Sequence, residues 1–581
     1  MEEPSIEIIR HSCAHIMASA VGKIFPDAKF AIGPAIKDGF YYDISVNAAV
    51  TEDDLKRIED AMRQDVKNKI PFERKELAID DALKFFTDNQ QKYKVELIND
   101  LKAQGVETVS LYQTGDFVDL CRGPHVEHTG KVRNFKLLSL SGAYWRGDEK
   151  NDQLIRIYGT AFKEKDELKN YLKNLEEAKK RDHRLLGKQL RLFDIYHNDA
   201  GAGLVFYLPK GTVLRKLIED WEITEHLKRG YQQVITPFIM DSKLWKKSGH
   251  LDFYNEFMYQ INKENQDFVL KPMNCPGHIL IYKSELHSWR DLPLRMFELG
   301  TVHRYEKSGV LHGLLRVRGF TQDDAHIFCT KDDLYNEIDG VLDFVKQTMD
   351  KFGFASFDAE LSTRPEKFIG DKANWDMAED ILEKVLKNKN ISYNINVGDG
   401  AFYGPKIDIK LTDALGRQWQ CATVQLDYNI PERFDLTYKD KEGKDTRVVM
   451  LHRVILGSIE RFIATLIEHY AGRFPLWLAP VQVSVLNIKP ELKEYATLIK
   501  DKLFDAKIRV EDDLREETLQ KKIRQKELQK IPYIIVVGDK ELENNNVSVR
   551  RAGRQDLGVM GIDDFIDLVK KEVETGEIRK N

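Results

Sequence analysis

The stretch Arg316-Val-Arg-Gly-Phe-Thr-Gln-Asp-Asp-Ala-His326 is the most informative part of this sequence, because its chemistry repeats every second residue. On a β-strand, alternate side chains lie on the same face of the sheet. One face would carry small or apolar side chains, with Asp323 as the exception. The pattern predicts a strand with a chemically active face rather than one that only meets solvent. That face would carry cations, a ring, an amide, a carboxylate and an imidazole: Arg316, Arg318, Phe320, Gln322, Asp324 and His326.

Two segments ahead of this strand share its density of functional side chains. The segment 297–306 runs just before it, and Gly309 and Gly313 in the connection favour an antiparallel hairpin. The segment 271–278 is rich in turn-forming residues, and we expect its Cys275 to lie in a loop.

A third segment, 451–461, reads as the end of a strand followed by an apolar helix. Gly457, Ser458 and Arg461 would then lie near a helix N-terminus, where backbone N–H groups favour anions. The sequence contains neither Gly-x-x-x-x-Gly-Lys-Ser/Thr nor Gly-x-Gly-x-x-Gly. A nucleotide bound in this part of the chain must therefore be held by arginines and an aromatic face.

Composition describes an ordinary globular protein of 581 residues, 42% hydrophobic and 31% charged, long enough for three or four domains. No apolar run approaches the roughly 20 residues of a membrane span. The acidic first residues do not resemble a signal peptide, so we predict a cytosolic protein without membrane contact. The net charge of −5 argues against binding nucleic acid by bulk charge alone.

The N-terminal part, to about residue 165, is predicted to be a mixed α/β unit with two paired motifs. His11 and His15 are four residues apart and would share one face of a helix. Cys121 and His125 have the same separation, in a segment where Gly-Pro favours a loop. These four side chains could bind zinc or hold a water for hydrolysis without metal. A metalloprotease is disfavoured, because Ser12 stands where the general-base Glu would be.

The remaining segments complete the domain plan. Residues 163–191 are charged and predict a connecting helix with a basic end. After residue 480, short apolar strands alternate with amphipathic helices, which predicts a separate three-layer α/β domain. Its basic side chains make an RNA-facing patch an alternative to a merely solvated surface: Lys521, Lys522, Arg524, Lys526, Arg550, Arg551 and Arg554.

Taken together, the motifs resemble one family over nearly the whole chain, the threonyl-tRNA synthetases of class II. The resemblance rests on Met273-Asn-Cys-Pro-Gly-His278, the opening stretch, Tyr403-Gly-Pro-Lys-Ile-Asp408 and His452-Arg-Val-Ile-Leu-Gly-Ser-Ile-Glu-Arg461. The N-terminal His-x-x-x-His and Cys-x-x-x-His pairs are similar to the family's editing domain.

The resemblance implies an α/β and α+β multidomain fold around an antiparallel-sheet catalytic core. The expected domains are an editing domain at 1–163, a linker helix at 164–184, a catalytic domain at 185–476 and an α/β anticodon-binding domain at 477–581. A homodimer interface is implied at motif 1, which would end near Thr236-Pro237. One departure is that the family's small ubiquitin-like domain is not expected ahead of His11.

The resemblance also implies a reaction: threonine is activated with ATP to threonyl-adenylate and transferred to tRNA(Thr). Cys275, His326 and His452 would bind one Zn²⁺, leaving an open position for the amino group and hydroxyl of threonine. Mg²⁺ would accompany ATP. The implied catalytic residues are Arg304, Lys406 and Arg461; the ATP-binding residues are Arg304, Arg316, Phe320 and Arg461; and the threonine-binding residues are Gln322, Asp324, Tyr403, Gln425 and His250.

A second active site follows from the selectivity of the first. A site that ligates a hydroxyl rejects valine, but serine lacks only a methyl group, a difference of roughly 1–3 kcal/mol. Seryl-tRNA(Thr) must then be hydrolysed elsewhere, and the family implies a metal-free site, although the ligand set would permit zinc. The implied editing residues are His11, His15, Cys121, His125, Asp119 and Lys94, and the implied anticodon contacts are Glu541 and Arg550.

Two other classes of function fit parts of the same sequence. A regulatory paralogue that has lost catalysis is disfavoured, because the phosphate-binding arginines and all three zinc ligands are present. A free-standing editing hydrolase is disfavoured by the intact catalytic motifs.

Overall fold

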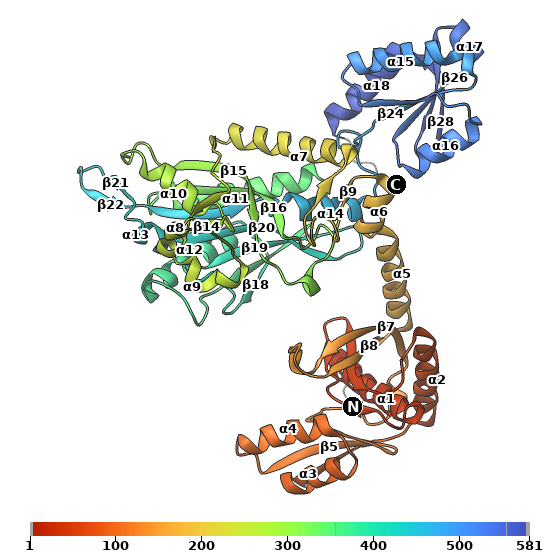
Figure 1. Cartoon of the computed structure of the whole chain (residues 1–581), viewed down its shortest axis with the longest axis vertical. Helices are drawn as coiled ribbons and strands as arrows, with labels where there is room; N and C mark the ends of the chain where they lie inside the picture. The colour runs from red at the N-terminus through yellow and green to blue at the C-terminus, as the bar shows by residue number, and fades with distance from the viewer. Residues whose placement is uncertain (1–3, 355, 554, 577–581) are drawn as a thin grey trace. The chain divides into compact units, whose positions relative to one another are not determined.

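The computed structural model describes residues 4–354, 356–553 and 555–576, so Arg554 of the predicted basic patch lies outside it (Figure 1). The chain forms two compact units, residues 1–176 and 177–581. Within the described ranges, each helix falls short of the length or apolar character that crossing a membrane requires.

The N-terminal unit packs helix α1 and helix α2 on a mainly antiparallel sheet of order β1-β3-β8-β7, with β2 paired to β3 (Figure 1). Ser5 caps α1 by accepting a hydrogen bond from the Ile8 N–H, and most of the helix is buried in the unit's core. The bounds are α1 Ile6–Ile24, α2 Glu52–Asn68, β1 Lys29–Phe30, β2 Ala35–Ile36, β3 Gly39–Ser45, β7 Asn134–Tyr144 and β8 Gln153–Phe162.

A smaller antiparallel sheet of order β4-β5-β6 carries its own core against helices α3 and α4. The chain leaves β6 in the loop that contains Cys121 and His125, as the Gly-Pro signal predicted. The bounds are β4 Phe72–Ala78, β5 Thr108–Thr114, β6 Phe117–Leu120, α3 Ile79–Asp88 and α4 Lys92–Ala103.

The connecting segment consists of two helices instead of the single one that its charge pattern predicted. Helix α5 spans Lys165–Arg181 and helix α6 spans His183–Leu190. Asp182 ends the first and caps the second, because its side chain accepts a hydrogen bond from the Arg184 N–H.

The largest sheet has eight strands in the order β11-β15-β16-β23-β20-β19-β17-β18. Only the β11–β15 and β17–β18 pairs are parallel, so the predicted antiparallel core is confirmed. The bounds are β11 Gln232–Gln233, β15 Leu294–His303, β16 Gly319–Cys329, β17 Phe357–Ser362, β18 Tyr393–Asn396, β19 Lys406–Thr412, β20 Gln418–Asp427 and β23 Val449–Val454.

Strand β16 contains most of the stretch 316–326, and it pairs with β15 in the predicted antiparallel hairpin. Ala325 and Ile327 enter the main apolar core, whereas Gln322, Asp324 and His326 line a cavity on the other face. The prediction was wrong about where the strand begins. It starts at Gly319, because a turn that joins His312 to Arg316 and a hydrogen bond from the Arg318 N–H to the Gly203 carbonyl precede it.

Helices surround this sheet and place the remaining motifs. Cys275 begins helix α10 with Pro276 beside it, so the prediction of a loop at Cys275 was wrong, since proline suits the first turn of a helix. Helix α14 follows β23 and has Ser458 near its N-terminus, as predicted; in the structure Ser458 is the N-cap residue, whose hydroxyl accepts a hydrogen bond from the Arg461 N–H. The bounds are α7 Pro209–Lys228, α8 Ser242–Ser248, α9 His250–Tyr254, α10 Cys275–Lys283, α11 Leu334–Lys351, α12 Lys372–Asn388, α13 Asn429–Arg433 and α14 Ile459–His469.

Three pairs or triplets of short strands lie outside the large sheet: β9 with β10, β12 with β14 and β13, and β21 with β22. Their bounds are β9 Phe193–Asp194, β10 Phe206–Tyr207, β12 Ile239–Asp241, β13 Tyr259–Lys263, β14 Gln266–Leu270, β21 Thr437–Lys439 and β22 Asp445–Arg447.

The C-terminal part is a three-layer α/β domain, as the alternating pattern predicted. Alternate residues of its central strand β26 enter two separate cores, one beneath α15 and α18 and the other beneath α16 (Figure 1). The bounds are β24 Val483–Asn487, β25 Val510–Asp513, β26 Tyr533–Val537, β27 Asn546–Arg551, β28 Gln555–Gly561, α15 Lys493–Asp505, α16 Leu519–Leu528, α17 Asp539–Glu543 and α18 Ile562–Thr575.

The basic patch predicted on this domain is smaller than the sequence indicated. Lys522 is buried and donates to the side-chain oxygen of Asn487, while Lys526 forms an ion pair with Glu511. Arg551 pairs with Glu572. These three cations serve the internal packing of the domain, because each has a partner within it.

Candidate active sites

A cavity of about 720 Å³ opens over the functional face of β16. Side chains from β16, β19, β20, β23, α10 and α14 reach it, together with loops. It collects all but one of the residues that the sequence assigned to catalysis, ATP, threonine and metal: Cys275, Arg304, Arg316, Phe320, Gln322, Asp324, His326, Tyr403, Lys406, Gln425, His452 and Arg461.

One end of the cavity is cationic and aromatic. The Arg304 guanidinium lies 5.1 Å from the centre of the Phe320 ring. Burial and the neighbouring Arg304 and Arg316 lower the pKa of Arg461, which means that three guanidinium groups face a common space. Glu306 balances Arg316 at 2.9 Å. Such a cluster, beside an exposed ring face, suits a polyphosphate with an aromatic base.

Arg318 differs from its neighbours because it does not line the cavity. Its side chain donates to the Glu306 carbonyl at 2.9 Å and lies near the Ser308 hydroxyl at 3.3 Å. This residue, which the sequence left without a substrate role, anchors the turn that precedes β16.

The other end of the cavity holds Cys275, His326 and His452, whose ligand atoms all lie within 4.8 Å of one another. All three side chains are buried. Burial, with Asp324 and Asp427, raises the pKa of the Cys275 thiol well above its usual range. Burial, with His278 and His452, lowers the pKa of His326 well below its usual range. The imidazole of His326 is therefore neutral, the form that binds a metal.

The hydrogen bonds around these imidazoles fit a metal ion. His452 Nε2 lies 2.9 Å from the carboxylate of Asp427, which can only accept, so the proton is on Nε2 and Nδ1 carries a lone pair. His326 Nδ1 is bonded to His278 at 2.8 Å, which leaves Nε2 to face Nδ1 of His452 at 3.0 Å. Metal-binding histidines commonly hold their second nitrogen in this way. The donor set therefore fits a tetrahedral zinc with one open position.

The predicted substrate residues lie between these two ends. Asp324 accepts a hydrogen bond from the Asn274 amide at 3.0 Å, and Tyr403 stacks on His452 while its hydroxyl donates to Gln425. The Lys406 ammonium is 2.6 Å from Asp408, which already balances its charge.

His250 is the predicted substrate contact that does not line the cavity. Its Nε2 lies 3.8 Å from the Cys275 thiol, and its Nδ1 is bonded to Ser248. The structure thus places His250 behind the thiol rather than beside the space where a substrate would bind.

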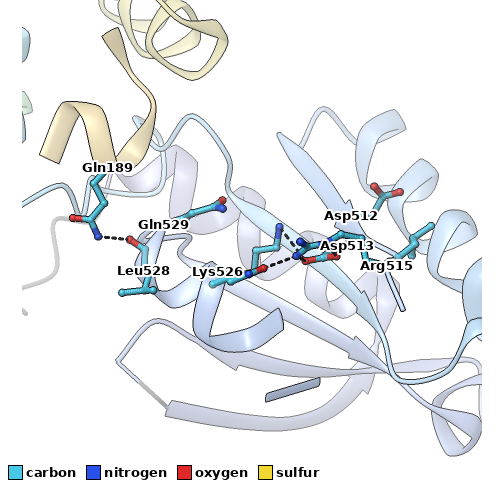
Figure 2. Close-up of a pocket in the computed structure, with 9 residues that line it drawn as sticks. Gln189, Asp512, Asp513, Arg515, Lys526, Leu528 and Gln529 are labelled. Carbon is cyan, nitrogen blue, oxygen red and sulfur yellow. Dashed lines mark hydrogen bonds and ion pairs between the residues drawn. The ribbon is translucent and has the colours of Figure 1, made fainter. Parts of the chain in front are cut away.

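A second concavity, of about 790 Å³, lies between α6 and the C-terminal domain and has no comparable chemistry. Figure 2 shows Gln189 on one side and Asp513, Arg515 and Lys526 on the other. Arg515 and Lys526 are both paired with acidic side chains. Its charges are therefore used internally, and we do not assign it an active site.

Four of the six predicted editing residues, His11, His15, Cys121 and His125, also converge, in the N-terminal unit. The Cys121 thiol lies 3.4 Å from His11 Nε2 and 3.3 Å from His125 Nε2, and all four ligand atoms, His15 included, lie within 4.8 Å of one another. Helix α1 supplies the two histidines four residues apart. Gly123 has a φ of 69° and no room for a side chain against Tyr112, which explains glycine in the loop that supplies the other pair.

The groups of this cluster are neutral. Burial, with His15 and His11, lowers the pKa of His125 to about 2. Burial raises the pKa of the Cys121 thiol to about 11, although the Gly123 N–H opposes the shift. Burial also lowers the pKa values of His11 and His15. At neutral pH the site can accept and donate hydrogen bonds without carrying charge on its imidazoles or thiol.

Asp119 and Lys94 form a buried ion pair of 2.5 Å beside His15, whose Nε2 is 3.5 Å from Asp119. The Tyr42 hydroxyl donates to the same carboxylate at 2.5 Å. Sequence reasoning missed Tyr42, since nothing in its local pattern marks it.

Ser12 was noted in the sequence only as the residue that excludes a metalloprotease. In the structure its hydroxyl accepts a hydrogen bond from the Val126 N–H and is 3.1 Å from His125 Nδ1. It therefore ties the Cys121–His125 loop to α1.

Asp427 was also missed, although it shares a strand face with Gln425, two residues earlier.

The predicted anticodon residues lie on the C-terminal domain, at α17 and β27. The Glu541 carboxylate accepts a hydrogen bond from the Gly538 N–H at 2.9 Å and so helps to cap α17. Arg550 lies on β27 and is half-buried. Neither residue lines the cavity over β16 or the concavity beside α6.

An antiparallel sheet that supports a cluster of arginines, a ring face and a neighbouring cysteine–histidine site defines a class II aminoacyl-tRNA synthetase. Three family profiles agree. The "tRNA synthetase class II core domain (G, H, P, S and T)" matches residues 259–470, and the "Anticodon binding domain" matches 482–572. The "Threonyl and Alanyl tRNA synthetase second additional domain" matches residues 109–158. The predicted fold class is confirmed.

Curated relatives show which family of class II synthetases this chain belongs to. A threonine–tRNA ligase of Citrifermentans bemidjiense is 55% identical over 571 residues, which cover 98% of this chain and 89% of the relative. One of Acetivibrio thermocellus is 52% identical over 576 residues, which cover 99% of this chain and 90% of the relative. The chain belongs to the threonine–tRNA ligase family, as the sequence predicted.

Solved structures agree with this assignment. The RNA-binding domain of threonyl-tRNA synthetase from Cryptosporidium parvum Iowa II has a TM-score of 0.65 at 41% identity, covering 67% of this chain and 98% of that one. A structure described as a threonyl-tRNA synthetase from Aeropyrum pernix has a TM-score of 0.61 at 31% identity, covering 68% of this chain and 96% of that one.

Proposed function

We propose that this threonine–tRNA ligase activates threonine at the cavity over β16, with one zinc ion held by Cys275, His326 and His452. As a class II synthetase, the enzyme uses ATP with Mg²⁺ to form threonyl-adenylate and then transfers the threonyl group to tRNA(Thr). The observation that carries the proposal is the pair of imidazole nitrogens, His326 Nε2 and His452 Nδ1, that face each other at 3.0 Å beside the Cys275 thiol. When bound, zinc would supply a Lewis acid that coordinates the amino group and hydroxyl of threonine.

The side chains around that position would do the remaining recognition. Asp324 would accept the threonine hydroxyl proton, since Asn274 already orients its carboxylate. Gln322 would bind the amino group, and Tyr403 with Gln425 would close the pocket. A partner buried without its hydrogen bond is costly, which is why valine would be rejected by about 10⁴-fold or more.

The arginine cluster would bind ATP. Arg304 would hold the α-phosphate and stabilise the charge that develops there as the threonine carboxylate attacks. Arg316 would bind the outer phosphates, while Phe320 and Arg461 would enclose the adenine. Lys406 is a weaker contributor in this scheme, because Asp408 neutralises it.

The N-terminal cluster would hydrolyse seryl-tRNA(Thr), the product that the first site cannot exclude. His11, His15, Cys121 and His125 would position a water at the seryl ester, and the Asp119–Lys94 pair would hold His15 in place. The cation of Lys94 next to the cluster disfavours a metal ion there, which supports the metal-free alternative.

Threonine-dependent exchange of pyrophosphate into ATP, with and without a chelator, tests the zinc proposal. We expect the purified enzyme to contain one zinc per chain and to lose exchange when zinc is removed, with recovery on readdition. Full exchange by a zinc-free enzyme would contradict the proposal.

We also propose a homodimer through motif 1. Large apolar side chains around Thr236-Pro237 are exposed: Ile235 is 85%, Phe238 56% and Ile239 50% exposed. Exposed groups of this kind commonly mark protein interfaces. Sedimentation should give a dimer that Phe238→Asp converts to monomer, and a monomeric wild-type enzyme would contradict the proposal.

The domain boundaries, the anticodon contacts Glu541 and Arg550, and a cytosolic location remain predictions from the sequence.

A further inference from the structure

A line of hydrogen-bonded side chains runs behind the proposed zinc site to the motif 1 segment. His326 Nδ1 is 2.8 Å from His278 Nδ1, and His278 Nε2 is 3.3 Å from a carboxylate oxygen of Glu298. The other carboxylate oxygen is 2.9 Å from the Lys271 ammonium. Thr236 completes the line by donating its N–H and its hydroxyl to Glu298 at 3.0 and 2.8 Å.

This line is shielded from water. His278 and Lys271 are 0% exposed, Glu298 is 3% and Thr236 is 4%. A buried ion pair is unfavourable unless each of its groups is hydrogen-bonded, and removing one partner leaves an uncompensated buried charge. The line that ends at the proposed zinc ligand His326 therefore contains a buried ion pair, Lys271–Glu298, whose groups must all keep their hydrogen bonds.

The direction of each hydrogen bond follows from the anchored carboxylate. Glu298 receives hydrogens from Lys271 and Thr236 and is acceptor-only, so His278 must donate to it from Nε2. The Nδ1 of His278 then carries a lone pair and accepts the Nδ1 proton of His326. The Nε2 of His326, which faces Cys275 and His452, is thereby left with its lone pair.

We propose that Glu298 and His278 are positioning residues that set the tautomer of the zinc ligand His326. Neither residue touches substrate. They act by keeping a proton off His326 Nε2, the atom that would bind the metal. The inference rests on the proposed function, because it presupposes zinc at Cys275, His326 and His452.

Glu298→Gln is the sharpest test, because it reverses the direction of the hydrogen bonds along this line without changing the number of heavy atoms in the side chain. Lys271 still requires an acceptor, so the amide oxygen would stay on its side and the amide NH₂ would face His278. His278 Nε2 would then accept, its Nδ1 would donate, and His326 would carry its proton on Nε2. We expect zinc affinity to fall by about 10–100-fold, the usual effect of losing a group that orients a metal ligand.

Glu337→Gln is the matched control. Glu337 is also a buried carboxylate paired with a residue of β15, Arg295, at 2.6 Å, but its hydrogen bonds go to Arg295 and not to the zinc residues. Zinc affinity, measured by competition with a chelator, should be unchanged in this control. The absorption spectrum of the cobalt-substituted Glu337→Gln protein should match that of the wild type. The spectrum of cobalt-substituted Glu298→Gln should be weakened or shifted. Thermal unfolding of the zinc-loaded proteins verifies that each variant is folded.

Two substitutions at His278 test whether this residue acts through its hydrogen bond to His326 or only through packing. In His278→Asn the amide oxygen can accept from His326 and preserve its tautomer, whereas His278→Leu removes the acceptor. We expect Asn to retain zinc affinity within about threefold and Leu to lose about 10–100-fold. Equal affinities in these two variants, or an unaffected Glu298→Gln, would overturn the inference.

The two proposals can fail separately. If wild type binds no more zinc than Cys275→Ala, the zinc site itself is refuted. If the wild type binds one zinc that Cys275→Ala loses, while Glu298→Gln binds zinc as tightly as the wild type, only the positioning role of Glu298 and His278 is refuted.

Discussion

The enzyme carries two clusters of cysteine and histidine that look alike in sequence and differ in their surroundings. In the catalytic domain, His452 and His326 each bond their outer nitrogen to a neighbour, so that two lone pairs converge beside Cys275. In the N-terminal unit, the Cys121 thiol lies between two imidazoles, and the Lys94 cation is close to the cluster.

We infer that the hydrogen-bond partners, and not the ligand types, distinguish the proposed zinc site from the proposed editing site. Asp427 and Glu298 supply negative charge behind the catalytic cluster, one directly and one through His278. At the editing cluster Asp119 is already paired with Lys94, so its charge is not available to balance a metal ion.

Cys275→Ala should have the largest effect. We expect the loss of bound zinc and a fall of about 10³-fold or more in threonine-dependent pyrophosphate exchange, because a Lewis acid worth several kcal/mol is removed. Deacylation of seryl-tRNA(Thr) should be unchanged. Cys121→Ala is the reciprocal control, with zinc content and exchange retained. If Cys121→Ala also lowered the zinc content, the two clusters would not differ as we propose.

His11→Ala with His15→Ala should abolish editing while leaving threonylation intact. We expect seryl-tRNA(Thr) deacylation to fall by about a hundredfold or more, the usual contribution of positioned acid–base groups. Serylated tRNA should accumulate in a charging assay that contains both amino acids. Unchanged deacylation in this double variant would move the editing site elsewhere.

The buried histidines should make the N-terminal unit sensitive to acid. The pKa of His125 is about 2 in the folded chain and 6.5 in the unfolded chain, so the unfolded state binds the extra proton. Its stabilising contribution is complete above pH 6.5 and falls as the pH drops from 6.5 towards 2, by about 1.4 kcal/mol per pH unit.

Hydrogen exchange of the α1 amides in the full chain, corrected for intrinsic rates, measures this slope between pH 6.5 and 5. His125→Asn should make the slope shallower. An identical slope in that variant would show that His125 is protonated in the folded state.

The smallest effect is expected in the pH profile of editing. Because the imidazoles are neutral and the Cys121 thiol has a pKa of about 11, the rate of deacylation should change less than about twofold between pH 6.5 and 8.5. A limb near pH 8.5 that disappears in Cys121→Ser would instead identify a reactive thiolate.

Local patterns predicted much of the architecture, and their failures have clear causes. The period of two identified the cavity face of β16 through Gln322, Asp324 and His326, because alternation is a property of the strand itself. It could not find the start of the strand, which a distant hydrogen bond to Gly203 decides. Lys522 looked like a surface cation, but Asn487, far away in the sequence, receives its hydrogen bonds inside the domain.

Residues that orient other functional side chains were not identified from the sequence, for the same reason. Tyr42 lies 77 positions from Asp119, the predicted residue that it contacts, and the two meet only because β3 and the end of β6 come together in the N-terminal unit. Asp427 and Glu298 bear ordinary carboxylates, and only their contacts with His452 and His278 reveal what they orient.

By itself, the sequence determined the chemistry: the strand alternation, the helical spacing of His11 and His15, and the motifs that predicted a threonine–tRNA ligase. Those features depend on residue types a few positions apart, which local backbone geometry converts directly into a shared face. Only the tertiary structure decided which protons the histidines carry and whether a cluster faces carboxylates or a lysine. A tautomer and a pKa are set by burial and by partners brought from distant segments, and no local pattern contains them.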